Sequence, residues 1–317
     1  MAAPIRHNSN LVGVGSLALG VVVFSLQDAI IKAISGDNPV TMAIVVRCLV
    51  ALPLLLLMVH LEAGVRRLWS ANAGVLLLRG AVLLVAYTTY FMSLPALPLA
   101  QAISLFFTAP LIITMLSGPL LGERVTLQGW LAVIVGFIGV LVILQPGSDV
   151  FEPAALLSLV SAATYALAMV IARRVGGTEP ATVMSFYQNG VYLVGAAAAA
   201  AVFNALDVAR PSHPSLEFLV RPWLMPSAWD LTLMAACGVI AAFGMFLLTH
   251  AYRLARASLV TVFEYTGMIW GPLWGFVFFG EIPSWATITG TVLIIAAGIY
   301  AVRTAADHNI EGPARPE

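Results

Sequence analysis

The stretch LVGVGSLALGVVVFSLQDAIIK, residues 11–32, decides how this chain folds. Residues 11–27 carry no formal charge, and Asp28 and Lys32 then follow one helical turn apart. About 20 apolar residues at 1.5 Å each cross the roughly 30 Å hydrocarbon core of a bilayer. The stretch is therefore expected to form a membrane-spanning helix with an acid and a base near one end. Ionisable groups inside a membrane are costly unless they face protein or water, so these two are candidates for function.

Composition extends this expectation to the whole chain. Of its 317 residues, 61% are hydrophobic and 9% are charged, and the mean hydropathy is +0.97. Soluble domains carry about 25% charged residues, so this chain could not cover its surface with polar groups. The net charge is zero and no basic block occurs, which argues against a nucleic-acid partner. Cys48 and Cys237 lie in apolar runs, where packing is expected rather than a disulfide framework or a zinc site.

Apolar runs separated by Gly, Pro and charged residues recur along the chain, and about ten are expected to be helices. We estimate them at residues 11–34, 40–60, 72–92, 96–120, 126–145, 153–173, 180–203, 228–252, 256–279 and 284–303. The first run is longer than the apolar part of a signal peptide and is expected to remain as a span. The fold class is thus an all-α integral membrane protein. A Pro-rich joint, residues 204–228, is expected on the membrane surface, and residues 304–317 form a polar tail.

The distribution of Lys and Arg predicts the orientation. With a cytoplasmic N-terminus, only Lys32, Arg210 and Arg221 fall on the outer side, and Arg47 and Arg79 lie within spans. The other basic residues then fall on the cytoplasmic side: Arg6, Arg66, Arg67, Arg124, Arg173, Arg174, Arg253, Arg256, Arg303 and Arg315. This excess follows the positive-inside rule, so both termini are expected in the cytoplasm of a bacterial-type inner membrane.

The two halves of the chain show a sparse internal repeat. Ile30, Gly36, Pro39 and Thr41 recur identically 141 residues later, with Lys32 replaced by Arg173. Gly80, Thr108 and the pair Gly122-Glu123 recur 158 residues later as Gly238, Thr266 and Gly280-Glu281. We therefore expect two repeats of five spans, residues 11–145 and 153–303. An odd number of spans inverts the second repeat, and inverted repeats are a common architecture of secondary transporters.

These residues resemble the EamA-type branch of the drug/metabolite transporter superfamily. The similarity lies in Asp28 with Lys32, VVRCL (45–49), Arg79-Gly80, LPLAQAISLFFTAPL (97–111), LGE (121–123), GFIGVLVILQP (136–146), GGTEP (176–180) and FGE (279–281). The resemblance implies a ten-span carrier of small metabolites with two inverted repeats and a central cavity. Such carriers include amino-acid exporters and carriers of riboflavin or S-adenosylmethionine. The family alone does not choose among these substrates.

Two acidic residues are candidates for substrate or proton binding. Asp28 either forms a helix-end ion pair with Lys32 or binds substrate or a proton. Glu264 lies in the middle of an apolar run, so its carboxylate must be protonated, paired or hydrated. It either pairs with Arg47, Arg79 or His250, or it binds an amino group or carries a proton.

Three basic residues lie in or at the end of spans. Arg47 either pairs with Asp28 or holds a substrate carboxylate, because a guanidinium keeps its charge. Arg79 is interpreted first as an anchor at the cytoplasmic end of its span. His250 ends a span, and a satisfied histidine near the surface is favoured there over a proton relay.

Aromatic residues inside spans complete the candidate site. Tyr and Trp away from the membrane interface need hydrogen-bond partners, and a pocket of such rings would suit a ring-bearing metabolite. Pro110 in the fourth run, and Gly267, Gly271 and Pro272 in the ninth, mark expected kinks. The full set of expected substrate-binding residues is Asp28, Arg47, Arg79, Tyr87, Tyr90, Phe106, Tyr165, Gln188, His250, Glu264, Tyr265 and Trp270.

The sequence therefore favours a secondary transporter of a small organic metabolite, working by alternating access. An amino acid or a related zwitterionic or aromatic compound is the preferred substrate, with riboflavin or S-adenosylmethionine as the alternative and protons as a candidate coupling ion. No HExxH, GxSxG or Walker motif occurs, so neither an intramembrane enzyme nor an ATP-driven pump is expected, and no cofactor or metal is implied. A structural or assembly protein without transport remains the alternative from another class.

Overall fold

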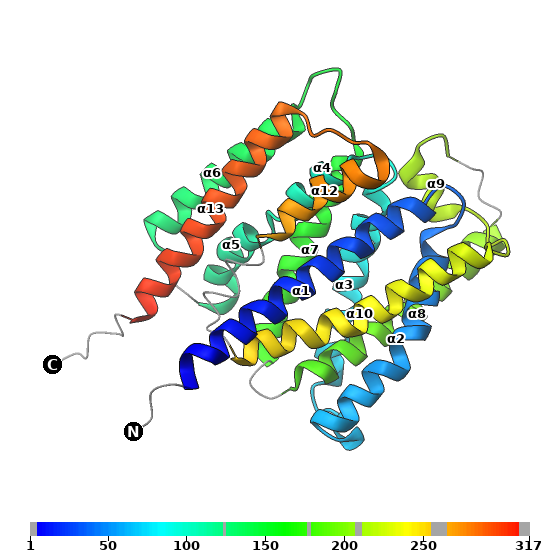
Figure 1. Cartoon of the computed structure of the whole chain (residues 1–317), viewed down its shortest axis with the longest axis horizontal. Coiled ribbons are helices and arrows are strands. Elements are labelled where there is room, and N and C mark those ends of the chain that lie inside the picture. The colour runs from blue at the N-terminus through cyan, green and yellow to red at the C-terminus, as the bar shows by residue number, and fades with distance from the viewer. Residues whose placement is uncertain (1–4, 123–124, 176–178, 207–210, 255–264, 311–317) are drawn as a thin grey trace.

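The computed structural model describes residues 5–122, 125–175, 179–206, 211–254 and 265–310. These residues form a bundle of long helices (Figure 1). In chain order the helices are α1 (Ile5–Ile34), α2 (Val40–Glu62), the 3-10 helix η1 (Val65–Leu68), α3 (Ala73–Ser93), α4 (Leu99–Phe106), α5 (Ala109–Leu121), α6 (Leu127–Leu144), α7 (Ala154–Val175), α8 (Ala181–Leu206), α9 (Pro214–Val220), α10 (Ala228–Leu254), α12 (Gly267–Phe279) and α13 (Trp285–Ile310).

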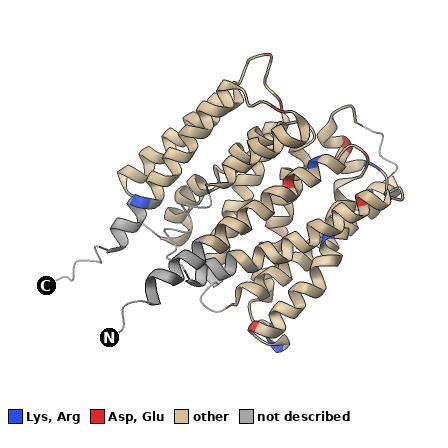
Figure 2. Ribbon diagram, viewed as in Figure 1, with Lys and Arg blue, Asp and Glu red and all other residues tan. Residues whose placement is uncertain are grey.

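Most of these helices are long and apolar enough to cross a membrane. Eight candidate spans meet this criterion, and α12 with the apolar part of α13 adds two shorter ones. Together they match the ten expected runs, and the all-α membrane fold is confirmed. Figure 2 shows long stretches of helix without any Lys, Arg, Asp or Glu. Large apolar side chains such as Leu57, Val194 and Phe276 are exposed, as lipid-facing positions require.

The fourth span is broken, as its prolines predict. It consists of α4 and α5, separated by Phe107 and Thr108, and Pro110 stands in the first turn of α5. Proline is tolerated there because the first turn of a helix needs no amide donor. Of the ninth expected run, only α12 and the turn before it lie in the described part of the chain, with Pro272 inside the helix.

Several helices of the two halves begin and end at matching positions. α5 and α12 start at 109 and 267 and end at 121 and 279, both followed by a left-handed glycine, Gly122 and Gly280. α6 and α13 start at 127 and 285, which is the same shift of 158 residues. α2 and α8 start at 40 and 181, a shift of 141. The sequence repeat therefore coincides with a repeat of helix boundaries.

The closest helix packing joins one half of the chain to the other. α6 packs on α13, α1 on α10, α3 on α7 and α2 on α8. α6 and α13 approach closely at Gly139 and Gly290, where an added Cβ on either residue would lie within 2.8 Å of the other's carbonyl oxygen. Small residues allow such close contact between membrane helices. The start of α1 and the end of α13 lie at the same end of the bundle in Figure 1.

The Pro-rich joint contains a short helix that the sequence did not predict. α9 (Pro214–Val220) buries Phe218. Arg221 donates hydrogen bonds to the Ser35 carbonyl and to Glu217. The Trp223 indole donates to Thr41 over 2.9 Å. This joint is thus folded against the end of the helix bundle.

Candidate substrate-binding site

Asp28 lies partly buried on α1 and bonds to α3. Its Oδ2 atom accepts a hydrogen bond of 3.0 Å from the Tyr90 hydroxyl. The alternative in which Asp28 pairs with Lys32 is wrong, because Lys32 turns to another partner. The Lys32 ammonium forms an ion pair with Glu281, at the end of α12, and donates to the Leu97 carbonyl. Asp28 is left with a neutral hydrogen-bond donor.

Glu281 connects three elements at this end of the bundle. One carboxylate oxygen pairs with Lys32 on α1, and the other accepts a 2.8 Å hydrogen bond from the Leu99 amide, the first residue of α4. An anion at a helix N-terminus is favourable because the helix dipole and the free amides point toward it. We call Lys32, Glu281 and the Leu99 amide the end clamp. Both charges of the end clamp are satisfied within the protein.

Arg47 is buried on α2, with 5% of its surface exposed. Its Nε donates to the Gln27 Oε1 atom over 3.0 Å, and its guanidinium lies 5.9 Å from the Tyr87 ring centroid. A cation within about 6 Å of an aromatic face is stabilised by the ring quadrupole. Among the described residues Arg47 forms no ion pair, so the alternative of pairing with Asp28 is not realised. An amide and an aromatic ring hold this cation.

Arg79 is buried on α3, with 7% of its surface exposed. Its side chain is therefore covered by protein, and the interpretation as an anchor at the cytoplasmic end of its span stays a prediction. Its Nη1 donates a long hydrogen bond of 3.4 Å to Gln188 Oε1, and its Nε has no hydrogen-bond partner. Gln188 donates to the Tyr192 hydroxyl over 3.1 Å, and that hydroxyl donates to the Leu83 carbonyl, also over 3.1 Å. A fixed chain of polar groups thus ends at Arg79.

Tyr87 connects these charges. It lies close enough to Asp28, Arg47 and Arg79 for the charge of each to act on its hydroxyl. Its ring centroid is 5.5 Å from that of Tyr192. We use the term central cluster for the charged and polar residues that these hydrogen bonds and ring contacts connect: Gln27, Asp28, Arg47, Arg79, Tyr87, Tyr90, Gln188 and Tyr192.

A line of aromatic rings borders the central cluster. Phe106, the last residue of α4, lies 5.1 Å from Tyr90 and 5.2 Å from Tyr165 between ring centroids. The line continues through Phe107 to Tyr265, at 6.2 and 5.7 Å. The end of α4 and the break after it therefore place two phenylalanines beside Tyr90, Tyr165 and Tyr265.

One of the expected site residues lies apart from this arrangement, and two cannot be placed in it. Trp270 stacks on Trp274 at 5.9 Å, and Trp274 bonds to Ser25, but among the described residues no ring contact or hydrogen bond joins Trp270 to the central cluster. Glu264 and the side chain of His250 lie outside the described residues, so their expected pairings are left as predictions. The other nine expected residues belong to the central cluster or to the aromatic line beside it.

Three contributors to the site were missing from the expected set. Gln27 and Glu281 each bond to a charged residue on another helix, and Tyr192 joins Gln188 on its own helix to the Leu83 carbonyl on α3. Gln27 precedes Asp28, Tyr192 lies one turn after Gln188, and Glu281 belongs to the repeated Gly-Glu pair. Polar residues within apolar runs were the available signal, but their partners lie on other helices.

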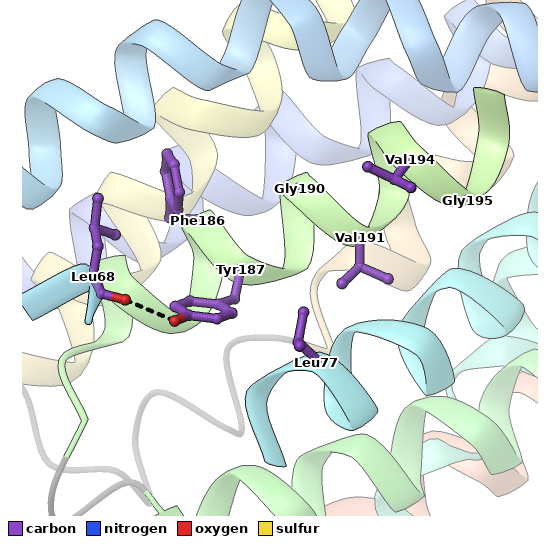
Figure 3. A pocket seen from close by; sticks show the side chains of 8 residues that line it. All are labelled: Leu68, Leu77, Phe186, Tyr187, Gly190, Val191, Val194 and Gly195. Atoms are coloured by element: carbon purple, nitrogen blue, oxygen red, sulfur yellow. Dashed lines mark hydrogen bonds between the residues drawn. The ribbon is translucent and has the colours of Figure 1, made fainter. Parts of the chain in front are cut away.

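A separate groove of about 480 Å³ lies between η1, α3 and α8 (Figure 3). It is lined by Leu68, Leu77, Phe186, Tyr187, Gly190, Val191, Val194 and Gly195. Its one side-chain hydroxyl, on Tyr187, donates to the Leu68 carbonyl over 2.7 Å. None of the twelve expected site residues lines the groove, and Val194 is 70% exposed. Its lining suits an apolar neighbour rather than a charged metabolite.

A multi-pass helical bundle with a buried cluster of charged and aromatic residues is typical of membrane transporters. The sequence profile of the EamA-like transporter family matches residues 11–145. The pseudopaline exporter CntI of Pseudomonas aeruginosa is 30% identical over 293 residues, covering 92% of this chain and 96% of that protein. The chain therefore belongs to the EamA-like transporter family and is a membrane transporter of small molecules.

Other relatives are named for different substrates. The S-adenosylmethionine uptake transporter of Rickettsia prowazekii is 26% identical over 239 residues, 75% of each chain. The riboflavin transporter of Rhizobium johnstonii is 32% identical over 211 residues, 66% of this chain and 64% of that protein. A solved crystal structure matches 97% of this chain and 100% of its own with a TM-score of 0.59. Its sequence identity is 20%, so this likeness concerns the fold alone.

Proposed function

We propose that this chain is a secondary active transporter of a small zwitterionic or aromatic metabolite, such as an amino acid, that works by alternating access. One observation carries the proposal. Asp28, Arg47 and Arg79 are gathered on three helices, and within the described part of the chain none of them forms an ion pair. Uncompensated charges in a membrane protein are costly. A substrate of complementary charge would explain why they are present.

The geometry suggests a role in substrate binding for each residue around Tyr87 and Tyr90 on α3. Asp28 would bind an ammonium group while the Tyr90 hydroxyl keeps the carboxylate in place. Arg47 would bind a carboxylate, because its guanidinium forms one hydrogen bond to an amide and leaves other donors for a ligand. Tyr87 and Phe106 would contact the body of the substrate. Glu264 is proposed as a second amine or proton site, so its neutral variant Glu264→Gln should alter transport or its pH profile.

Alternating access is supported by the repeat in the fold. The helix contacts are symmetric when the halves are exchanged, since α1 packs on α10 as α7 packs on α3. Inverted repeats can form two equivalent openings around one site. In the present conformation the end clamp joins α1, α4 and α12. We infer that this clamp opens when substrate passes that end of the bundle.

The orientation is proposed with both termini in the cytoplasm. The start of α1 and the end of α13 lie at one end of the bundle, and the distribution of arginines favours that end as cytoplasmic. The end clamp would then face the outside.

A vitamin or cofactor is the second candidate substrate. Relatives are named as riboflavin and S-adenosylmethionine transporters, and the line of aromatic rings beside Phe106 offers surfaces for a ring system. The alternative from another class is a structural or assembly membrane protein that transports nothing.

Uptake into proteoliposomes tests these alternatives. Labelled amino acids, riboflavin and S-adenosylmethionine would be offered separately under an imposed pH gradient or membrane potential. We expect saturable uptake of at least one compound, and its loss in Asp28→Asn but not in the matched control Asp149→Asn, which alters an exposed aspartate. A response to the pH gradient would support proton coupling. Uptake no greater than in empty liposomes for every compound and gradient would refute the proposal.

A further inference from the structure

The environment of Arg79 is unusual even within the central cluster. The side chain is 7% exposed, its Nε has no partner, and its Nη1 makes a single hydrogen bond of 3.4 Å. Arginine has five N–H donors and stays charged at all physiological pH values. A buried guanidinium with so few acceptors is therefore strongly under-satisfied. An anion at this position would relieve that deficit.

The protein groups around Arg79 cannot neutralise it. The ionisable side chains close enough to act on Arg79 are Tyr165, Tyr192 and Tyr87, and a tyrosine hydroxyl is neutral at physiological pH. Gln188, its hydrogen-bond partner, is held in place through the Tyr192 hydroxyl and the Leu83 carbonyl. Within the described residues no carboxylate forms an ion pair with Arg79. The surroundings are polar, neutral and fixed, which is the environment expected of a preorganised anion site.

Arg79 lies about three helical turns before Tyr90, the residue that bonds to the proposed ammonium site. Tyr90 holds Asp28, and Arg79 lies on the same helix eleven residues earlier. Eleven residues correspond to about 16 Å along a helix axis. Tyr87, in electrostatic range of both charges, lies between them on α3. In an α-amino acid the ammonium and carboxylate groups share one carbon atom, whereas an elongated molecule with a second anionic group can extend along α3 from Asp28 toward Arg79.

We propose that Arg79 binds an anionic group at the far end of an elongated zwitterionic substrate whose ammonium group lies at Asp28. This inference rests on the proposed function and narrows its substrate class. The preferred cargo carries an amino group at one end and a second carboxylate at the other. Arg47 would take the carboxylate nearest the ammonium, and the aromatic rings of Tyr87 and Tyr192 would flank the connecting chain.

Binding measurements with compounds of graded length test this inference. The detergent-solubilised full chain would be titrated calorimetrically with glycine, glutamate and γ-glutamylglutamate. We expect affinity to rise along this series. Arg79→Gln should weaken binding of γ-glutamylglutamate by roughly 10- to 100-fold, the value of one charge-assisted contact, and change glycine binding by less than about 3-fold.

Two further variants keep the test decisive. Arg79→Lys retains the charge without the planar fork, so it should recover part of the lost affinity for γ-glutamylglutamate. Arg67→Gln, which removes an exposed arginine of η1, should leave all three affinities unchanged. Equal weakening of glycine and γ-glutamylglutamate by Arg79→Gln would overturn the Arg79 assignment alone. Absence of binding of any of the three compounds to the wild-type protein would overturn the zwitterion proposal as well.

Discussion

The end clamp and the central cluster place charges in the same membrane protein in opposite ways. In the clamp, Lys32 and Glu281 pair with each other, and the spare carboxylate oxygen bonds to the Leu99 amide. In the central cluster, Asp28 accepts a hydrogen bond from a tyrosine hydroxyl, and Arg47 donates one to a glutamine side chain. Arg79 donates only a long hydrogen bond of 3.4 Å to another glutamine side chain. One region pairs its charges directly, while in the other none of the three charges forms an ion pair within the described part of the chain.

This difference suggests a way to tell structural charges from functional ones. Removing one partner of a desolvated ion pair leaves the other unpaired and destabilises the fold. Removing an unpaired charge relieves a cost instead, unless a ligand supplies the counter-charge. Loss of one charge of the end clamp should therefore lower the stability of the fold, whereas loss of one charge of the central cluster should lower transport without lowering stability.

The largest expected effect is on transport by Asp28→Asn. Asparagine keeps an oxygen acceptor for the Tyr90 hydroxyl but cannot neutralise an ammonium group. Loss of one charge-assisted contact should lower the ratio kcat/KM for uptake by about 100-fold. Proteoliposome uptake of the compound identified in the screen would measure this. Uptake within about 3-fold of wild type would place Asp28 outside the binding site.

A charge reversal tests the end clamp next. Lys32→Glu would place two carboxylates together and should reduce uptake about 10-fold. The double variant Lys32→Glu with Glu281→Lys should recover most of that loss, because the two residues are coupled. Recovery should be incomplete, since a lysine cannot accept the hydrogen bond of the Leu99 amide. If the loss of uptake in the double variant equalled the product of the fold losses in the two single variants, the two residues would not be coupled.

Tyr90→Phe should have a moderate effect. It removes the hydroxyl that orients Asp28 but leaves the ring that packs on Phe106. We expect an increase in KM of about 3- to 10-fold with little change in the melting temperature, consistent with the loss of one hydrogen bond. An unchanged KM would mean that Asp28 needs no orientation by Tyr90.

The smallest effect is expected at the groove beside α8. Tyr187→Phe removes the hydrogen bond to the Leu68 carbonyl, and within the described part of the chain the Tyr187 side chain forms no hydrogen bond or ring contact with the central cluster. Uptake should therefore stay within about 2-fold of wild type. A loss as large as that of Tyr90→Phe would indicate that the groove takes part in transport.

The sequence predicted the helices better than their contacts. Hydropathy placed the start of α2 at 40 and of α10 at 228, because bilayer thickness fixes the length of an apolar run. Pro110 likewise indicated the break before α5. The partner of Lys32 could not be inferred, because Glu281 lies 249 residues away and only packing brings the two together. Asp28, one helical turn from Lys32, was the obvious partner by sequence and proved wrong.

The candidate site was predicted in residue type but not in arrangement. Arg47 and Arg79 stood out as charges in apolar runs. Their different surroundings depend on Gln27 and Gln188, which lie on other helices. Periodicity identifies the face of a helix but not the neighbour that this face meets. The short helix α9 was not predicted because seven residues are too few to form a long apolar run or a clear helical periodicity.

The central claim is that unpaired charges serve the cargo and paired charges serve the fold. Melting temperatures of purified Asp28→Asn and Glu281→Gln, measured beside wild type in the same detergent, test it most directly. We predict that Glu281→Gln lowers the melting temperature by several degrees, because it leaves Lys32 unpaired, whereas Asp28→Asn leaves it unchanged or raises it. A fall for Asp28→Asn as large as that for Glu281→Gln, with uptake retained, would contradict the account.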